Sequence, residues 1–130
     1  MKWNRGNKYN ARASPAGVPG YISELNGPLS TASQAEATFY ADLDNLWRAG
    51  EIKWWLAQVS FTVGTTDDKL KRVTYRSDAL VCRANGEMVV LDRKGFDTPA
   101  SRAKRAAVRD RYKIRVEIVT RHARNSLEGG

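Results

Sequence analysis

Two strand-like segments on either side of Asn85-Gly86 constrain the fold of this chain more than any other feature of its sequence. Asn-Gly is the strongest short-range signal for a β-hairpin, because its residues readily adopt the positive φ angles of a two-residue turn. Residues 73–81 alternate between two faces before the turn, and residues 88–94 read Met-Val-Val-Leu-Asp-Arg-Lys after it. The sequence therefore predicts an antiparallel pair of strands here.

This predicted hairpin carries three side chains suited to the hydrolysis of a phosphodiester. Asp92 and Lys94 lie two residues apart on one strand, so they point to the same face. Asp78 lies on the preceding strand, and the hairpin brings the two acids near each other. Clustered carboxylates bind a divalent cation that activates water, and a lysine can orient this water or neutralise charge. An exposed edge hairpin in which Lys94 is an ordinary cross-strand partner is the alternative.

The segment from about Ala32 to Ala49 is predicted to be a helix. Possible N-cap residues occupy positions 30–33, and Gly50 supplies a stop signal. Apolar residues recur on one face of this helix, which we expect to be buried: Ala35, Phe39, Leu43 and Leu46, with Tyr40 and Trp47 widening the stripe. Glu36 falls within the same arc, where a carboxylate needs either a function or a neighbouring arginine.

Three further elements complete the predicted order. Residues Ile52 to Val63 are rich in Trp, Val and Phe and predict a strand, on which Gln58 either bonds DNA or the water of a metal site or is a plain surface residue. Thr98-Pro99 begins a second helix that runs to about Arg111, and alternation from Tyr112 to Ile118 predicts a final strand. The order helix, three strands, helix, strand indicates a mixed α/β (α+β) domain with a sheet flanked by helices.

The second helix is expected to have two distinct faces. Alanines at 100, 103 and 107 form a narrow seam for packing on the sheet. The opposite ridge consists of Arg102, Arg105 and Arg109. These arginines either contact the phosphates of a nucleic acid or form an ordinary solvated surface.

The charge balance favours a polyanionic partner. The chain has 22 Lys+Arg and 14 Asp+Glu, which gives a net charge of +8. Residues 1–28 are predicted to be a flexible basic arm, and residues 121–130 a polar tail. The arm is either a solvated leader or a phosphate contact, through its four basic residues before the first acid: Lys2, Arg5, Lys8 and Arg12. Nucleic acid is the leading candidate partner.

Other features of the sequence argue against a membrane protein, a secreted protein and a zinc site. No apolar run approaches the roughly 20 residues of a membrane-spanning helix, and the polar N-terminus lacks the apolar region of a secretory signal. The single Cys82 has no partner for an internal disulfide, which favours a reducing cytoplasm.

Trp54 and Trp55 are adjacent, so one of them is expected to be buried in the core or an interface rather than stacked on bases. His122 has no nearby His or Cys to complete a zinc site, and we expect it to be structural or exposed.

Four of these polar residues carry a resemblance to the PD-(D/E)xK nuclease superfamily. They are the acid on the first helix and the hairpin group, namely Glu36, Asp78, Asp92 and Lys94. More narrowly, residues 30–119 resemble small phage-encoded endonucleases related to endonuclease I type Holliday junction resolvases. The shared residues include Ala49-Gly50-Glu51-Ile52, Gln58, Phe61, Tyr75 and Val89 to Phe96. The chain departs from the superfamily in Ser77, where proline is usual, and in Arg93, where an apolar residue is commoner.

The resemblance implies a restriction-endonuclease-like core over residues 29–120, with the order α-β-β-β-α-β. It also implies that Asp78, Asp92, Glu36 and the backbone carbonyl of Arg93 bind Mg²⁺ or Mn²⁺, and that the substrate is branched DNA. A small domain that cuts two strands is expected to act as a twofold homodimer, in the host cytoplasm if a phage encodes it. A non-catalytic basic nucleic-acid-binding module, or a nuclease of the same fold acting on linear duplex or single-stranded DNA, remains open.

Overall fold

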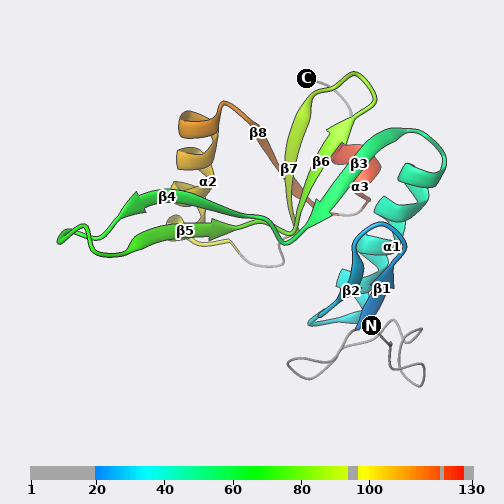
Figure 1. Cartoon of the computed structure of the whole chain (residues 1–130), viewed down its shortest axis with the longest axis horizontal. Helices are drawn as coiled ribbons and strands as arrows, with labels where there is room; N and C mark the ends of the chain where they lie inside the picture. The colour runs from blue at the N-terminus through cyan, green and yellow to red at the C-terminus, as the bar shows by residue number, and fades with distance from the viewer. Residues whose placement is uncertain (1–19, 94–96, 121, 128–130) are drawn as a thin grey trace.

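A computed structural model of the chain describes residues 20–93, 97–120 and 122–127. These residues form a mixed α+β fold (Figure 1). The strands are β1 Tyr21–Ser23, β2 Gly27–Leu29, β3 Ile52–Ala57, β4 Ser60–Thr65, β5 Arg72–Arg76, β6 Ala79–Arg83, β7 Met88–Arg93 and β8 Arg115–Val119. The helices are α1 Gln34–Arg48, α2 Pro99–Tyr112 and α3 Ala123–Leu127.

The central element is a mixed four-stranded sheet with the order β3-β6-β7-β8. β6 pairs antiparallel with β3 and β7, whereas β7 and β8 are parallel and are connected through α2. The predicted Asn85-Gly86 hairpin is confirmed: Gly86 has a φ of 90°, and its N–H donates to the carbonyl of Arg83 over 2.8 Å. The sheet thus places the end of β7 between two neighbouring strands.

Both faces of the sheet are covered, and α1 and α2 lie on opposite sides (Figure 1). Val89 and Leu91 point into a core shared with α1 and α3, while Val90 points into a second core shared with α2 and the β4–β5 hairpin. β7 therefore reads as a continuous apolar run, because each of its faces packs against other elements. A polar side chain near its end is consequently held in a buried environment.

The two long strands predicted at 52–63 and 73–81 are each broken, which corrects their expected continuity. Gln58 adopts a φ of 58° and ends β3, and residues 77–78 separate β5 from β6. β4 and β5 pair with each other instead of joining the central sheet, and they extend away from it as a two-stranded ribbon (Figure 1). The cause is the left-handed turn at Gln58, which redirects the chain without a glycine or proline to signal it.

The first helix is confirmed, with differences on its buried face. The Ser33 hydroxyl caps it by accepting the N–H of Glu36 over 3.1 Å. Ala35 is exposed, contrary to the predicted stripe, and the buried face instead includes Ala37 and Asp44. The apolar arc is shifted because the helix packs against both the sheet and the β1–β2 hairpin.

The second helix is also confirmed, but the prediction for its faces was wrong. Ala100 and Ala103 are exposed, whereas Arg105 and Val108 are buried. The helix continues through Tyr112, so the final strand starts later than predicted, at Arg115. An ion-pairing arginine has replaced the expected alanine seam as the packing residue, because carboxylates lie beneath the helix.

The described fold extends beyond residues 29–120 at both ends. β1 and the first two residues of β2 lie within the segment predicted as an arm, the two strands form a hairpin against α1, and α3 lies within the predicted tail. Ala123 and Leu127 of α3 are buried in the main core. In the described parts of the chain, no helix is long and apolar enough to cross a membrane.

Candidate functional site

Asp78 and Asp92 meet where the hairpin of β6 and β7 reaches the end of the sheet. The Asp78 backbone N–H donates to the carbonyl of Leu91 over 3.2 Å, which fixes Asp78 beside the end of β7. The Asp78 carboxylate then accepts the backbone N–H of Arg93 over 2.6 Å. Gln58 N–H and the Tyr40 hydroxyl donate to the Asp78 carbonyl. The predicted meeting of the two acids is therefore built by backbone hydrogen bonds on both sides of Asp78.

The environment of Asp78 disfavours a negative charge. Burial raises the pKa of its carboxyl to about 6, and the N–H of Arg93 opposes this rise by stabilising the carboxylate. The nearby carboxyls of Asp92 and Glu36 raise the pKa further, by repulsion and, for Asp92, by a hydrogen bond. Glu36 thus lies near enough to Asp78 for its charge to raise the pKa of the Asp78 carboxyl. Acids that repel one another in this way form a site that a cation would stabilise.

Asp92 is held by groups from two other elements. It is 3% exposed, and the hydroxyl of Tyr75 on β5 donates to it over 2.5 Å. Burial and this hydrogen bond raise the pKa of Tyr75, so the phenol stays protonated and remains a donor. The Arg105 guanidinium on α2 lies 4.0 Å from the same carboxylate oxygen and 2.8 Å from Asp97. One oxygen of Asp92 therefore faces a phenol and a buried cation.

Glu36 and Asp78 line one pocket of about 380 Å³ between α1 and the strand junction. Glu36 is half-buried at the first turn of α1, which puts it near Asp78. Gln58 lies in the same pocket, where its side-chain amide donates to Ser30 and accepts from Arg76. The remaining lining residues are Thr31, Ala32 and Ser77. The pocket gives Glu36 and Asp78 an opening to solvent.

The donor set suits a hard divalent cation, because it consists of carboxylate oxygens in a partly desolvated site. Asp78 and Asp92 are adjacent, and Glu36 lines the same pocket as Asp78. Within residues 20–93, 97–120 and 122–127, no group of three or more His, Cys, Asp and Glu lies close enough to hold an ion by itself. A bound ion would therefore be held mainly by the Asp78–Asp92 pair. Lys94 lies outside the described residues.

The predicted nucleic-acid contacts are not equivalent to one another. Arg102 is exposed, and Arg109 is exposed while donating to the carbonyl of Val116 over 2.8 Å. Arg105 is 3% exposed and faces Asp92 and Asp97, so it is not part of a surface ridge. The four basic residues of the predicted arm lie outside the described residues: Lys2, Arg5, Lys8 and Arg12.

Two neighbours of the acids were not predicted as site residues, namely Tyr75, which holds Asp92, and Arg76, which lines the pocket of Asp78. Arg105 was predicted as a nucleic-acid contact at the surface and not as a neighbour of Asp92. Alternation along residues 73–81 put Tyr75 on the strand face opposite that of Asp78 and could not identify Asp92 as its partner. That pairing depends on the separation of β5 from β6, which no residue in the sequence signals.

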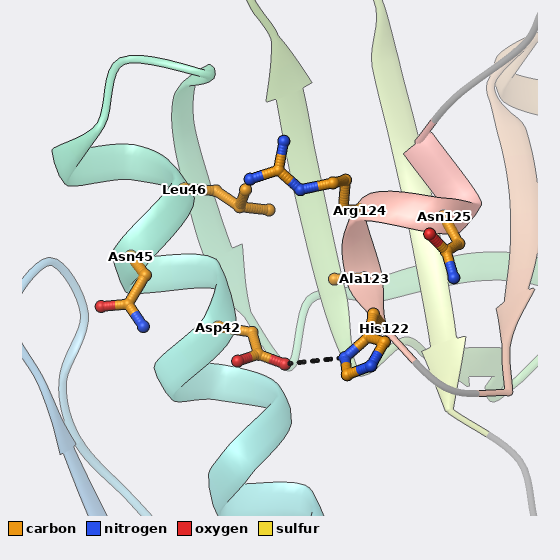
Figure 2. Close-up of a pocket in the computed structure, with 7 residues that line it drawn as sticks. All are labelled: Asp42, Asn45, Leu46, His122, Ala123, Arg124 and Asn125. Atoms are coloured by element: carbon orange, nitrogen blue, oxygen red, sulfur yellow. Dashed lines mark ion pairs between the residues drawn. The ribbon is translucent and has the colours of Figure 1, made fainter.

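A second pocket of about 360 Å³ lies between α1 and α3 and contains none of the predicted site residues (Figure 2). His122 points toward Asp42 across it, with 3.8 Å between Nδ1 and the carboxylate. The His122 side chain is 72% exposed. Trp55 is fully buried and stacks on Tyr40, whereas Trp54 is half-buried, as expected for adjacent strand residues.

Fold and site together define an α+β protein in which a buried acid, Asp92, adjoins a half-buried acid, Asp78, at the end of the central strands. The chain belongs to a protein family of unknown function (DUF1064), which it matches over residues 27–126. The match includes every described element except β1 and the last residue of α3. No curated protein and no solved structure matches the chain.

Proposed function

We propose that this protein is a metal-dependent DNA endonuclease. The observation that carries the proposal is the pair formed by Asp78 and Asp92, with Glu36 on the same pocket and a raised pKa at Asp78. A protein rarely retains desolvated acids that repel one another unless a ligand or a reaction requires them. The net charge of +8 adds an affinity for polyanions.

The order of the elements supports a restriction-endonuclease-like core. The elements α1, β3, β6, β7, α2 and β8 follow the α-β-β-β-α-β order of the PD-(D/E)xK nucleases, which the residues resemble. The β4–β5 ribbon is an insertion between the first and second of these strands. The proposal is further supported by the locations of its three acids: Glu36 lies on α1, Asp78 immediately before β6 and Asp92 on β7.

Asp78 and Asp92 would hold Mg²⁺ or Mn²⁺, together with the carbonyl of Arg93 and with Glu36 directly or through water. Such an ion activates water and stabilises the charge that develops on the phosphate. Arg93 N–H and the Tyr75 hydroxyl orient the two carboxylates. Lys94 follows Arg93 in the sequence and would orient the attacking water or neutralise charge near the scissile phosphate.

The resemblance supports branched DNA such as Holliday junctions as the substrate, and a phage origin with action in the host cytoplasm. A twofold homodimer would place one site on each of two strands. A same-fold nuclease of linear duplex or single-stranded DNA is the nearest alternative. A panel of four-way junction, flap, duplex and single strand with Mg²⁺ separates these substrates.

The site assignment is tested by Asp92→Ala and Lys94→Ala in that cleavage assay. We expect each change to abolish Mg²⁺-dependent cleavage while DNA binding in EDTA stays largely intact. Asp110→Asn is the matched control, because its carboxylate is 87% exposed on α2. Cleavage that survives both site changes would refute the assignment.

A second candidate is a non-catalytic basic module that binds nucleic acid. It is favoured by the finding that no three acids in the described residues lie close enough to hold an ion alone. Calorimetric titration with Mg²⁺ or Mn²⁺ separates the two functions, because a pure binding module has no reason to bind the metal. Metal binding that Asp78→Asn and Asp92→Ala remove supports the nuclease.

A further inference from the structure

The β4–β5 ribbon projects from the molecule without contributing to the central sheet (Figure 1). One of its faces packs on α2: Tyr75 is buried, Phe61 stacks edge-on against Tyr112, and the Tyr112 hydroxyl donates to the Thr62 carbonyl. The ribbon is therefore anchored at its base by apolar packing.

The outer face of the ribbon consists of hydroxyl and guanidinium side chains. Side chains alternate along β5, so Arg72, Thr74 and Arg76 share the face turned away from α2, and all three are exposed. Opposite them on β4, the register pairs Arg76 with Ser60, Thr74 with Thr62 and Arg72 with Thr65. No carboxylate occurs on either strand. This composition offers donors for phosphate oxygens along the whole face.

The tip of the ribbon adds positive charge. Lys69 and Lys71 flank Leu70, which is 81% exposed and contributes nothing to either core. The acids of the turn are Asp67 and Asp68, and the Asp68 carboxylate accepts the Thr66 hydroxyl and the N–H of Leu70. One of the two acids is thus engaged in shaping the turn. With four basic residues and two acids, the ribbon has a net positive charge.

The outer face leads directly to the proposed active site. Arg76 at the base of β5 lines the pocket that contains Glu36 and Asp78. From Arg76 to Arg72 the strand spans about 14 Å at roughly 3.4 Å per residue. That length corresponds to about four nucleotides of one DNA strand, at about 3.4 Å of axial rise each. A strand whose phosphate reaches the acids can therefore continue along the ribbon.

We infer that the outer face of the β4–β5 ribbon binds the sugar-phosphate backbone of DNA next to the cleaved bond. Arg72 and Arg76 supply the charge, and the hydroxyls of β4 and β5 supply further hydrogen bonds. This inference rests on the proposed function for its choice of DNA as the partner. It does not require that the acids be catalytic, because binding and cleavage are measured separately.

The test compares Arg72→Ala with Lys53→Ala by fluorescence anisotropy on labelled DNA in EDTA, where metal-dependent cleavage is absent. Both residues are exposed, and each change removes one positive charge, but Lys53 lies on β3 away from the ribbon. We expect Arg72→Ala to weaken binding about tenfold, as the loss of one charged hydrogen bond implies. The dependence of log K on log salt should become shallower by about 0.9 for a duplex. Lys53→Ala should change neither quantity.

Arg72→Lys should restore the salt dependence, because it returns the charge, and its melting temperature should match that of the wild type. If the wild type binds DNA, two results would overturn the ribbon interface. One is that Arg72→Ala and Lys53→Ala weaken DNA binding equally, and the other is that Arg72→Ala does not weaken it at all. A wild type that binds no DNA would overturn both this interface and the proposed function. Ribbon-dependent binding without any Mg²⁺-dependent cleavage would refute the nuclease alone.

Discussion

Asp78 shows how a single residue connects the fold to the proposed chemistry. Its backbone joins three segments through hydrogen bonds to Gln58, Tyr40 and Leu91. Its carboxylate lies near the carboxylates of Asp92 and Glu36. The backbone contacts hold the residue in place whatever its charge. The side chain is consequently available for a ligand, and the fold bears the cost of its desolvation.

Because the desolvated Asp78 carboxylate destabilises the fold when it is charged, we expect Asp78→Asn to stabilise the folded protein at high pH. The folded pKa of Asp78, about 6, lies above the ordinary value of 3.8 for an aspartate, so the stability from this group is fully present below 3.8 and is lost as pH rises through about 6. In EDTA at pH 8 the variant should therefore unfold with a free energy about 1–3 kcal/mol higher than the wild type. Near pH 4 the two proteins should agree. Urea unfolding at both pH values measures this, and an Asn variant that is less stable at pH 8 would contradict it.

Arg105 is predicted to be a structural cation rather than a DNA contact. Arg105→Ala leaves Asp92 buried without its neighbouring charge, which typically costs about 3 kcal/mol or more for a buried pair. The exposed Arg102 on the same helix is the matched control, and Arg102→Ala should cost less than about 0.5 kcal/mol. Urea unfolding in EDTA gives both values. Equal and small losses in the two variants would show that Arg105 does not stabilise Asp92.

At the level of elements, local signals predicted most of the structure. The cap at Ser33, the Thr98-Pro99 start of α2 and the Asn85-Gly86 turn are short-range features, and all three formed as expected. The β4–β5 ribbon was missed because Gln58 turns the chain with a left-handed φ that its residue type does not announce. The acids were found through their spacing, whereas the partners Tyr75 and Arg105 depend on packing between distant elements.

Asp44 connects three secondary-structure elements, and the amphipathic pattern of the first helix did not predict this role. Fully buried on α1, it accepts hydrogen bonds from four donors that tie the β1–β2 hairpin and β3 to the helix: the hydroxyls of Tyr21 and Ser23, the N–H of Glu24 and the indole of Trp55. Asp44→Ala should therefore lower the free energy of unfolding by about 3–5 kcal/mol. Urea unfolding followed by tryptophan fluorescence measures the loss, and a value under about 1 kcal/mol would contradict this role.

Over the whole molecule, the proposed site is assembled from segments far apart in the sequence. Glu36 comes from α1, Tyr75 from the ribbon, Asp92 from the central sheet and Arg105 from α2. Each segment belongs to one of the two cores that cover the sheet. A ligand that neutralises the acids should therefore stabilise the fold as a unit, since no single element contains the site.

Mg²⁺ or Mn²⁺ is accordingly expected to raise the melting temperature of the whole protein. Binding at 100 times its Kd adds about 2.7 kcal/mol, which corresponds to a rise of several degrees for a domain of this size. Ionic strength is matched with NaCl, so that screening of the net charge of +8 does not contribute. Asp110→Asn should retain the shift, while Asp92→Ala should lose it. Two results would show that the paired acids do not form a metal site. Either neither ion raises the melting temperature of the wild type, or the ions still raise the melting temperature of the Asp92→Ala variant.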